Sequence, residues 1–266
     1  MQRDAGVGRR QTKNRARHPL AGFVGRKPMK TAIVTGGTRG IGRGVVHYLV
    51  SKGYYCLVTY GSSVSDASKL EDELPSQVEL LKVDHRFPKL VEETIGKTLR
   101  DLKIDVLVNC VSNDLCKTVG ECSLEEWTET VSLILTNTFV MAKLCLPGMR
   151  ERKFGRIINF GAGSYNYLTG NYGLSPYGIC KGAIILLTKE LALEEIRNGI
   201  TANIIGPGST RSAGPNPEEK RIPIERLPLG RRIEIEEIVN AVDFLLRPES
   251  GVITGQIINV CGGYSV

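Results

Sequence analysis

Apolar residues in this chain form seven short, nearly unbroken runs, separated by longer segments in which apolar positions recur at helical spacing. The runs are residues 31–35, 55–60, 78–83, 105–110, 156–160, 200–205 and 256–260. Unbroken apolar runs of this length are typical of parallel strands that are covered on both faces. The segments between them predict helices at about 40–52, 64–74, 87–101, 124–152, 176–197 and 234–247.

The regular alternation of strand and helix predicts the fold class. We expect one α/β domain with a Rossmann fold, in which a doubly wound, seven-stranded parallel sheet carries helices on both faces. In such sheets, ligands bind beyond the carboxyl ends of the strands. Five segments follow strands at that edge, "TGGTRGIG", "VDH", "VNCVS", "FGAGS" and "IGPGS". We therefore expect one site built from these five loops.

Composition narrows the class of protein. The chain has 266 residues, of which 41% are hydrophobic and 24% charged, and this suits a single domain with a substantial core. No stretch approaches the apolar length of a membrane span, and no secretory signal pattern opens the chain. The seven cysteines include no C-x-x-C pair and the three histidines lie far apart, which argues against disulfides and against a metal site. We expect a cytoplasmic protein without a bound metal.

The formal charge of +7 is concentrated at one end of the chain. Residues 1–28 hold eight Lys or Arg and one acidic residue, so the remainder is neutral, with 27 basic and 27 acidic residues. The segment 1–28 lacks apolar periodicity, and we interpret it as a basic, disordered extension that carries no chemistry. A transit peptide or a nucleic-acid-binding arm is the alternative. The folded domain then covers residues 29–266, and its neutrality indicates neither a nucleic-acid nor a membrane partner.

The stretch "TAIVTGGTRGIG" at residues 31–42 places a glycine cluster between a strand and a helix. At such a junction, free backbone N–H groups and the positive end of the helix dipole face an anion, and missing side chains let a pyrophosphate approach. The spacing G-x-x-x-G-x-G differs from the commoner G-x-G-x-x-G. A tight turn without a ligand is the alternative interpretation.

The stretch "SPYGICK" at residues 175–181 supplies candidate chemistry. Ser175 is a suitable N-cap and Pro176 suits the first helical position, which puts Tyr177 and Lys181 on one helix face. A lysine ammonium beside a phenol favours the phenolate, so such a tyrosine can exchange a proton near neutral pH. An exposed tyrosine beside a solvated lysine is the alternative, because Y-x-x-x-K alone is common.

Four motifs in order resemble the classical short-chain dehydrogenase/reductase family, most closely its 3-oxoacyl-acyl-carrier-protein-reductase-like members. They are "TGGTRGIG" for T-G-x-x-x-G-x-G, "SPYGICK" for Y-x-x-x-K, "NIIGPGS" for N-x-x-x-P-G, and "VITGQIINVCGG" for the closing strand. The resemblance implies hydride transfer between a nicotinamide and a carbonyl or alcohol carbon. It implies Tyr177 as the general acid in reduction and Lys181 as the residue that holds the nicotinamide ribose. It also implies a homotetramer formed through the helices at 124–152 and 176–197.

The resemblance further implies a cofactor site. Asp84 would contact the adenine, Asn109 would line the groove, and Pro207 and Gly208 would surround the nicotinamide end. The full set of expected cofactor-binding residues is Gly36, Thr38, Arg39, Gly40, Ile41, Gly42, Ser62, Ser63, Asp84, His85, Asn109, Tyr177, Lys181, Pro207, Gly208 and Thr210.

The chain departs from the family pattern at three positions. The glycine of the N-N-A-G motif is Ser112, and the aligned position of the catalytic serine is Ala162. We expect Ser164, thirteen residues before Tyr177, to supply the missing hydroxyl, with a turn residue as the alternative role. The family's helical asparagine is replaced by Ile134. In the family that asparagine holds a water in a proton relay, so we expect either Asn137 or a backbone carbonyl near Ile134 to take over that role.

The end of the second strand bears on the choice of cofactor. An acid there would accept from the ribose hydroxyls of NAD and repel a 2′-phosphate, but the first acid after this strand is Asp66. Ser62, Ser63 and Arg39 are suited to a phosphate instead. We therefore expect an NADPH-dependent reductase of a 3-oxoacyl thioester, bound to a carrier protein or CoA, or of a related ketone. The alternatives are a family member acting on a specialised-metabolite, polyol or steroid ketone, or a cofactor-binding protein with weak catalysis.

Overall fold

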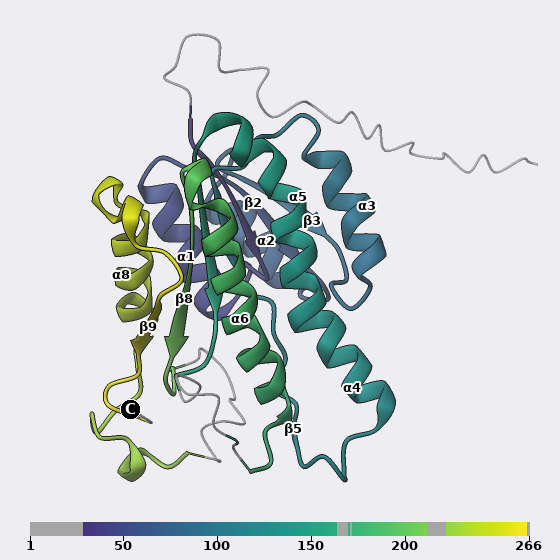
Figure 1. The fold of residues 1–266 in the computed structure, drawn as a ribbon, viewed down its shortest axis with the longest axis vertical. Helices are drawn as coiled ribbons and strands as arrows, with labels where there is room; N and C mark the ends of the chain where they lie inside the picture. The colour runs from purple at the N-terminus through teal and green to yellow at the C-terminus, as the bar shows by residue number, and fades with distance from the viewer. Residues whose placement is uncertain (1–28, 164–169, 171, 212–221, 265–266) are drawn as a thin grey trace, which may run out of the picture.

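Seven parallel strands form the centre of the computed structural model, which describes residues 29–163, 170, 172–211 and 222–264 (Figure 1). The strands are β1 (Thr31–Thr35), β2 (Tyr55–Tyr60), β3 (Val78–Lys82), β4 (Val106–Asn109), β6 (Gly155–Phe160), β8 (Ile200–Pro207) and β9 (Ile257–Val260). Their order in the sheet is β3-β2-β1-β4-β6-β8-β9. The order reverses between β1 and β4, which leaves a crevice beyond the carboxyl ends of these two strands.

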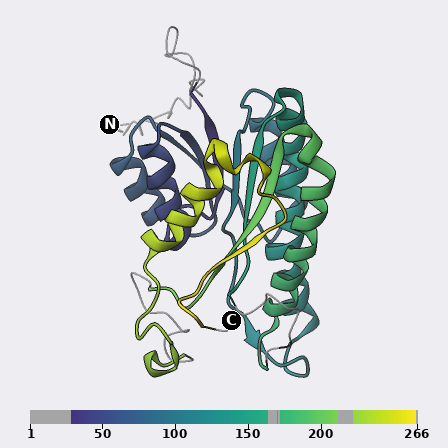
Figure 2. The ribbon, with the colours of Figure 1, turned by 60° about the vertical axis from the view of Figure 1, so that its left-hand side comes forward.

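Helices cover both faces of the sheet (Figure 2). One layer contains α1 (Gly40–Ser51), α2 (Val64–Glu73) and α8 (Ile235–Leu246), and the other contains α3 (Pro88–Thr98), α4 (Leu124–Val131), α5 (Asn137–Arg152) and α6 (Tyr177–Glu195). Short 3-10 turns lie at Ile196–Asn198, Ile224–Arg226 and Pro248–Val252. Each layer buries its own apolar cluster against the sheet. The predicted fold class is therefore confirmed, and the seven predicted strands lie within one or two residues of their expected positions.

The segment predicted as one helix at 124–152 contains a change of helix type. Between α4 and α5, Ser132–Thr136 form a π-helical turn, in which the Asn137 N–H reaches the Ser132 carbonyl. The Thr138 hydroxyl also donates to the Ile134 carbonyl, at 2.7 Å. Apolar spacing cannot distinguish such a turn from a regular helix, because one widened turn shifts the pattern by a single residue.

The start of α6 differs from the prediction that Ser175 is its N-cap. The helix begins at Tyr177, and Pro176 occupies the N-cap position. Residues Ser175–Pro176 instead form the short strand β7, which pairs antiparallel with β5 at Cys116–Lys117. This small ribbon holds the residues before Tyr177 against the loop that follows β4, so the N-cap prediction was wrong.

The run from Leu124 to Arg152 has the length and composition of a membrane span, so the expectation that no stretch approaches such a length was wrong. Its most apolar window has a mean hydropathy of 1.4, but 44% of that window is buried within the domain. Met141, Cys145 and Met149 pack in the cluster between the helices and the sheet. We therefore interpret the run as a core helix.

Candidate active site

A groove of about 1460 Å³ runs along the carboxyl ends of the strands. Most of the residues that were expected in the site from the sequence line it, from four loops and the first turns of α6: Gly36, Thr38, Arg39, Gly40, Ile41, Gly42, Ser62, Ser63, Asp84, His85, Tyr177, Lys181, Pro207, Gly208 and Thr210. Segments far apart in the sequence therefore meet at one place. Their individual roles in binding remain predictions.

The glycine loop has the geometry of an anion cradle. Gly36 adopts a φ of +64°, which disfavours any other residue, and a Cβ on Gly42 would lie 2.5 Å from the Gly36 carbonyl oxygen. Within the described residues, no side chain caps the start of α1 and no acid lies in its first turn. The free N–H groups of that turn and the helix dipole are thus available to an anion, and the loop fits a pyrophosphate.

Tyr177 and Lys181 lie one helical turn apart at the wall of the groove. The Lys181 Nζ lies 5.5 Å from the centre of the Tyr177 ring and donates a hydrogen bond to the Phe160 carbonyl oxygen at 2.8 Å. Only 4% of Lys181 is exposed, and this burial lowers its pKa to about 8. The ammonium is therefore held under the tyrosine with little competing water, which strengthens its electrostatic effect on the phenol.

The third expected catalytic residue, Ser164, lies outside the described residues. The aligned position, Ala162, lines the groove and has no hydroxyl to offer. The substitution of Ser164 for the family serine remains a prediction.

Asp84 and Asn109 were both expected to contact the cofactor, but only Asp84 lines the groove. Asp84 lines the groove, and its carboxylate accepts hydrogen bonds from the Arg86 guanidinium, which lowers the pKa of Asp84. Asn109 is not a lining residue of the groove. It is 5% exposed and donates from Nδ2 to the Asn159 Oδ1 at 2.8 Å, so its side chain ties β4 to β6 behind the groove wall.

The two expected substitutes for the family's relay asparagine both make hydrogen bonds within the protein. Asn137 is 1% exposed, and its Oδ1 lies 2.5 Å from the Nδ1 of His85. The Ile134 carbonyl accepts from both the Asn137 N–H and the Thr138 hydroxyl. The Ile134 side chain is fully buried with Cys180 and does not line the groove. Both relay routes, through Asn137 or through a backbone carbonyl near Ile134, remain predictions.

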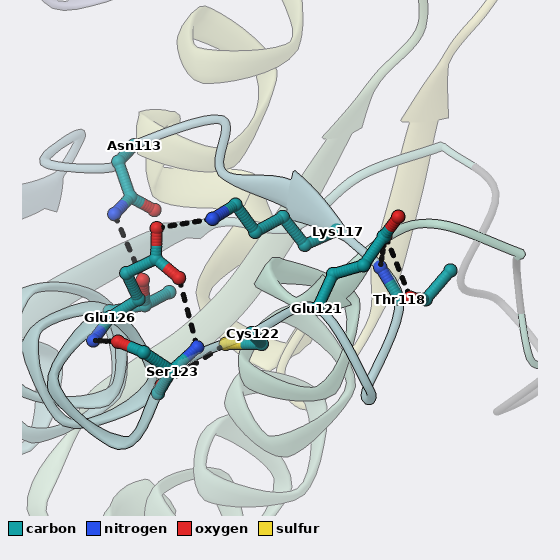
Figure 3. A network of polar contacts seen from close by, with 8 residues as sticks. Asn113, Lys117, Thr118, Glu121, Cys122, Ser123 and Glu126 are labelled. Atoms are coloured by element: carbon teal, nitrogen blue, oxygen red, sulfur yellow. Dashed lines mark hydrogen bonds and ion pairs between the residues drawn. The ribbon is translucent and has the colours of Figure 1, made fainter.

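The loop after β4 forms another wall of the groove and is fixed by polar contacts (Figure 3). Asn113 lines the groove and donates from Nδ2 to the Thr130 hydroxyl at 3.1 Å. Lys117 pairs with Glu126 at 2.6 Å, and Glu126 forms a capping box with Ser123 at the start of α4. The sequence signal for this wall was the capping box, S-x-x-E, ahead of an apolar helix.

Several residues that line the groove were not predicted from the sequence. They are Asn113, Asp114, Tyr172, Ser209, Arg211, Arg226 and Tyr264. Ser209 lies in the quoted "NIIGPGS" segment but was not assigned a role, and the others come from segments that converge only in the folded chain.

The part of the chain that the structure describes has no group of three His, Cys, Asp or Glu placed to hold a metal. All seven cysteines are free. Burial raises the pKa of the Cys56 thiol to about 12, as it does for Cys110 and Cys145, so these thiols are unreactive at neutral pH.

The model of the family described as enoyl-(acyl carrier protein) reductase matches residues 36–265. Among characterised proteins, the acetoacetyl-CoA reductase of Rhizobium meliloti is 35% identical over 240 residues, which cover 88% of this chain and 98% of the relative. The 3-oxoacyl-[acyl-carrier-protein] reductase of Aquifex aeolicus is 33% identical over 242 residues, covering 88% of this chain and 96% of the relative.

Solved structures give the same picture. A 3-oxoacyl-reductase from Bacillus thuringiensis is 30% identical, with a TM-score of 0.79 over 90% of this chain and 99% of that one. An actinorhodin polyketide ketoreductase variant with NADPH is 28% identical, with a TM-score of 0.80 over 89% of this chain and 97% of that one. The similarity extends over the whole described domain.

Proposed function

This chain belongs to the short-chain dehydrogenase/reductase family, and we propose that it is an NADPH-dependent reductase that converts a ketone to the alcohol. The observation that carries the proposal is the placement of Tyr177 and Lys181 at the wall of the groove that also contains the glycine loop. A proton donor and an anion cradle within one groove are what carbonyl reduction by a dinucleotide requires.

In this mechanism the nicotinamide, when bound, would supply the hydride that adds to the carbonyl carbon. Tyr177 gives its phenolic proton to the carbonyl oxygen, so the new C–H and O–H bonds complete the alcohol. The Lys181 ammonium stabilises the phenolate that remains. The backbone of the glycine loop would hold the pyrophosphate, and Pro207 and Gly208, which line the same groove, would contact the nicotinamide end.

The preference for NADPH rests on three side chains at one end of the groove. Arg39, Ser62 and Ser63 all line the groove, and neither Tyr60, which ends β2, nor Gly61, which follows it, is acidic. A guanidinium and two hydroxyls suit a 2′-phosphate. The structural relative determined with NADPH supports this assignment.

The substrate we favour is a 3-oxoacyl thioester on a carrier protein or CoA, as the names of the similar reductases suggest. The polyketide ketoreductase supports a second candidate, a specialised-metabolite ketone. A cofactor-binding role with weak catalysis is the third, because Ala162 offers no hydroxyl at the groove wall. We place the protein in the cytoplasm, since its free thiols suit a reducing compartment.

We also propose that the chain forms a homotetramer through the α4–α5 and α6 helices. Ile179, Leu186 and Leu193 follow one another at intervals of seven along α6, and they are 52%, 54% and 76% exposed. Phe139 of the adjacent α5 is 50% exposed. An apolar stripe of this kind is best covered by another copy of the same helix in a symmetric assembly.

A substrate panel tests the proposed reaction. Purified protein is mixed with acetoacetyl-CoA and with cyclic and aromatic ketones, and oxidation of NADPH and of NADH is followed at 340 nm. We expect Tyr177→Phe to lower kcat by at least about 100-fold while NADPH binding is retained, because only the acid is removed. The control is Tyr54→Phe, which removes a phenol that does not line the groove. Equal turnover by Tyr177→Phe would contradict the mechanism, and a kcat/KM for NADH at or above that for NADPH would reverse the cofactor assignment.

A further inference from the structure

A buried hydrogen-bonded chain connects α5 to the glycine loop through His85. The imidazole is 4% exposed, and it lies between the Asn137 Oδ1, 2.5 Å from Nδ1, and the Thr59 hydroxyl, 2.7 Å from Nε2. The Thr59 Oγ1 in turn accepts from the Gly36 N–H at 3.3 Å. The chain therefore runs from α5 through the loop after β3 and through β2 to the first glycine of the loop.

Donor and acceptor roles in this chain are fixed by chemistry. An amide oxygen only accepts, so Nδ1 of His85 carries the proton and Nε2 carries a lone pair. The Thr59 hydroxyl then donates to Nε2, and its lone pair is left for the Gly36 N–H. With these roles, each contact in the chain joins one donor to one acceptor. This arrangement requires a neutral imidazole that carries its proton on Nδ1.

Thr59 holds the glycine loop at two adjacent points. Its hydroxyl accepts from Gly36, and its backbone carbonyl accepts from the Gly37 N–H at 3.3 Å. Gly36 is in the left-handed region, with φ at +64°. Fixing a glycine in one conformation costs more backbone entropy than fixing any other residue. Contacts that select this conformation before the ligand arrives lower the entropy cost of binding.

We propose that His85 is a positioning residue for the glycine loop: it connects Asn137 to Thr59, and Thr59 orients Gly36 toward the cofactor pyrophosphate. The proposal rests on the proposed dinucleotide function, and it gives Asn137 a role in cofactor affinity in place of the proton relay expected from the sequence. His85 lines the groove, but its ring is directed at Asn137 and Thr59.

The surroundings of His85 support a neutral ring. Burial holds the pKa of His85 below its ordinary value of 6.5, although the hydrogen bond to Asn137 and, to a smaller extent, the Asp84 carboxylate oppose this shift. The Asp84 carboxylate is itself paired with Arg86. From β2 and α5, the groups that contact the ring are Thr59 and Asn137, neither of which titrates. A protonated ring would place an N–H on the Thr59 oxygen and force its hydroxyl to find another acceptor.

The first experiment removes the Thr59 hydroxyl without changing its shape. Dissociation constants for NADPH are measured by fluorescence titration for the wild type, Thr59→Val and Thr59→Ser, together with melting temperatures and kcat at saturating cofactor. We expect Thr59→Val to weaken NADPH binding about tenfold, since one hydrogen bond to the loop is lost. Thr59→Ser keeps the hydroxyl and should bind within about threefold of the wild type. Equal affinity in Thr59→Val and Thr59→Ser would overturn the proposal.

The second experiment charges the ring. In Asn137→Asp, a carboxylate replaces the amide oxygen beside Nδ1 and raises the pKa of His85. We expect its NADPH affinity to fall severalfold as the pH is lowered from 8 to 6, relative to the wild type over the same range. A pH dependence identical to that of the wild type would overturn the proposal, even if Asn137→Asp is less stable.

Asn137→Leu distinguishes a positioning role from a proton relay. A relay through Asn137 predicts that this variant lowers kcat and leaves NADPH affinity unchanged, whereas positioning predicts a raised dissociation constant. If the wild type binds NADH and not NADPH, only the cofactor assignment fails, and the same variants are compared with NADH. If the wild type binds neither, the proposed function fails and the positioning role of His85 fails with it.

Discussion

At the scale of single residues, Lys181 shows how function and stability oppose each other. Its ammonium is 4% exposed and makes one described hydrogen bond, to the Phe160 carbonyl oxygen. Burial lowers its pKa from 10.5 to about 8. A shift of this size corresponds to roughly 3 kcal/mol that favours the unfolded state while the group is charged.

We therefore expect Lys181→Met to raise the melting temperature and abolish turnover. The gain of roughly 3 kcal/mol from removing the buried charge is offset by about 1 kcal/mol for the lost hydrogen bond, which leaves a rise of about 5 °C. Because the pKa of Lys181 is lowered in the folded state, the stability penalty of its charge depends on pH. The charge destabilises the folded state fully below pH 8, and this penalty disappears as the pH rises from about 8 toward 10.5, so the advantage of Lys181→Met should shrink over that range.

Differential scanning calorimetry at pH 6, 7, 8 and 9 measures this effect. Lys189→Met, on the exposed side of the same helix, is the matched control and should change the melting temperature little. A Lys181→Met variant that is less stable than the wild type at pH 7 would contradict this prediction. It would show that the contacts of the ammonium stabilise the fold by more than burial of its charge destabilises it.

At the scale of elements, the junction of α4, the π-helical turn and α5 packs tightly against α6. Ile134 is completely buried there with Cys180 and Ile184, and Tyr177 packs on the same cluster. The family's asparagine at this position would bring an amide into these apolar surroundings. An unpaired amide in such a position destabilises the fold in addition to the packing lost with the isoleucine.

We expect Ile134→Asn to lower the free energy of unfolding by about 3 kcal/mol or more without raising kcat. Ile134→Val keeps an apolar side chain and should cost about 1 kcal/mol. Urea denaturation and steady-state kinetics on both variants measure the two quantities. A several-fold rise in kcat in Ile134→Asn would mean that this position still serves a proton relay and that packing is not its main role.

The elements themselves were largely predictable because each depends on local pattern. Buried parallel strands are short apolar runs, and the glycines of the loop at residues 36–42 mark where the first strand ends and the first helix begins. The ribbon of β5 and β7 was not predictable, since two residues on each side carry no periodicity. Its pairing also moved Ser175 out of the N-cap position.

The candidate site was predictable only where a motif carried it. Tyr177, Lys181 and the glycine loop have spacings that chemistry imposes, whereas Asn113 and Arg226 reach the groove through tertiary structure alone. Asn109 shows the reverse case. It lies in a motif, but its side chain is buried, is bonded to Asn159 and is not among those that line the groove. The pairing of His85 with Asn137, 52 positions apart, has no local signal at all.

At the scale of the whole molecule, the two helical layers differ in the surface they leave uncovered. The α5 and α6 helices lie side by side on one side of the sheet (Figures 1 and 2). Ile179, Leu186 and Leu193 form the exposed stripe on α6. Association that covers such a stripe removes apolar surface from water, which lowers the free energy. Self-association of this face is therefore the state we expect in solution.

We expect light scattering after size exclusion to give a mass near four times 29.1 kDa for the wild type. Leu186→Glu places a carboxylate in the middle of the stripe, where two copies of α6 would bring two such charges together, and it should dissociate the assembly into smaller species. Val64→Glu is the matched control, because Val64 is 51% exposed on α2 in the opposite layer and should leave the mass unchanged. A wild-type mass of 29.1 kDa at micromolar concentration would contradict the assembly, and a Leu186→Glu variant that keeps the wild-type mass would place the interface on another face.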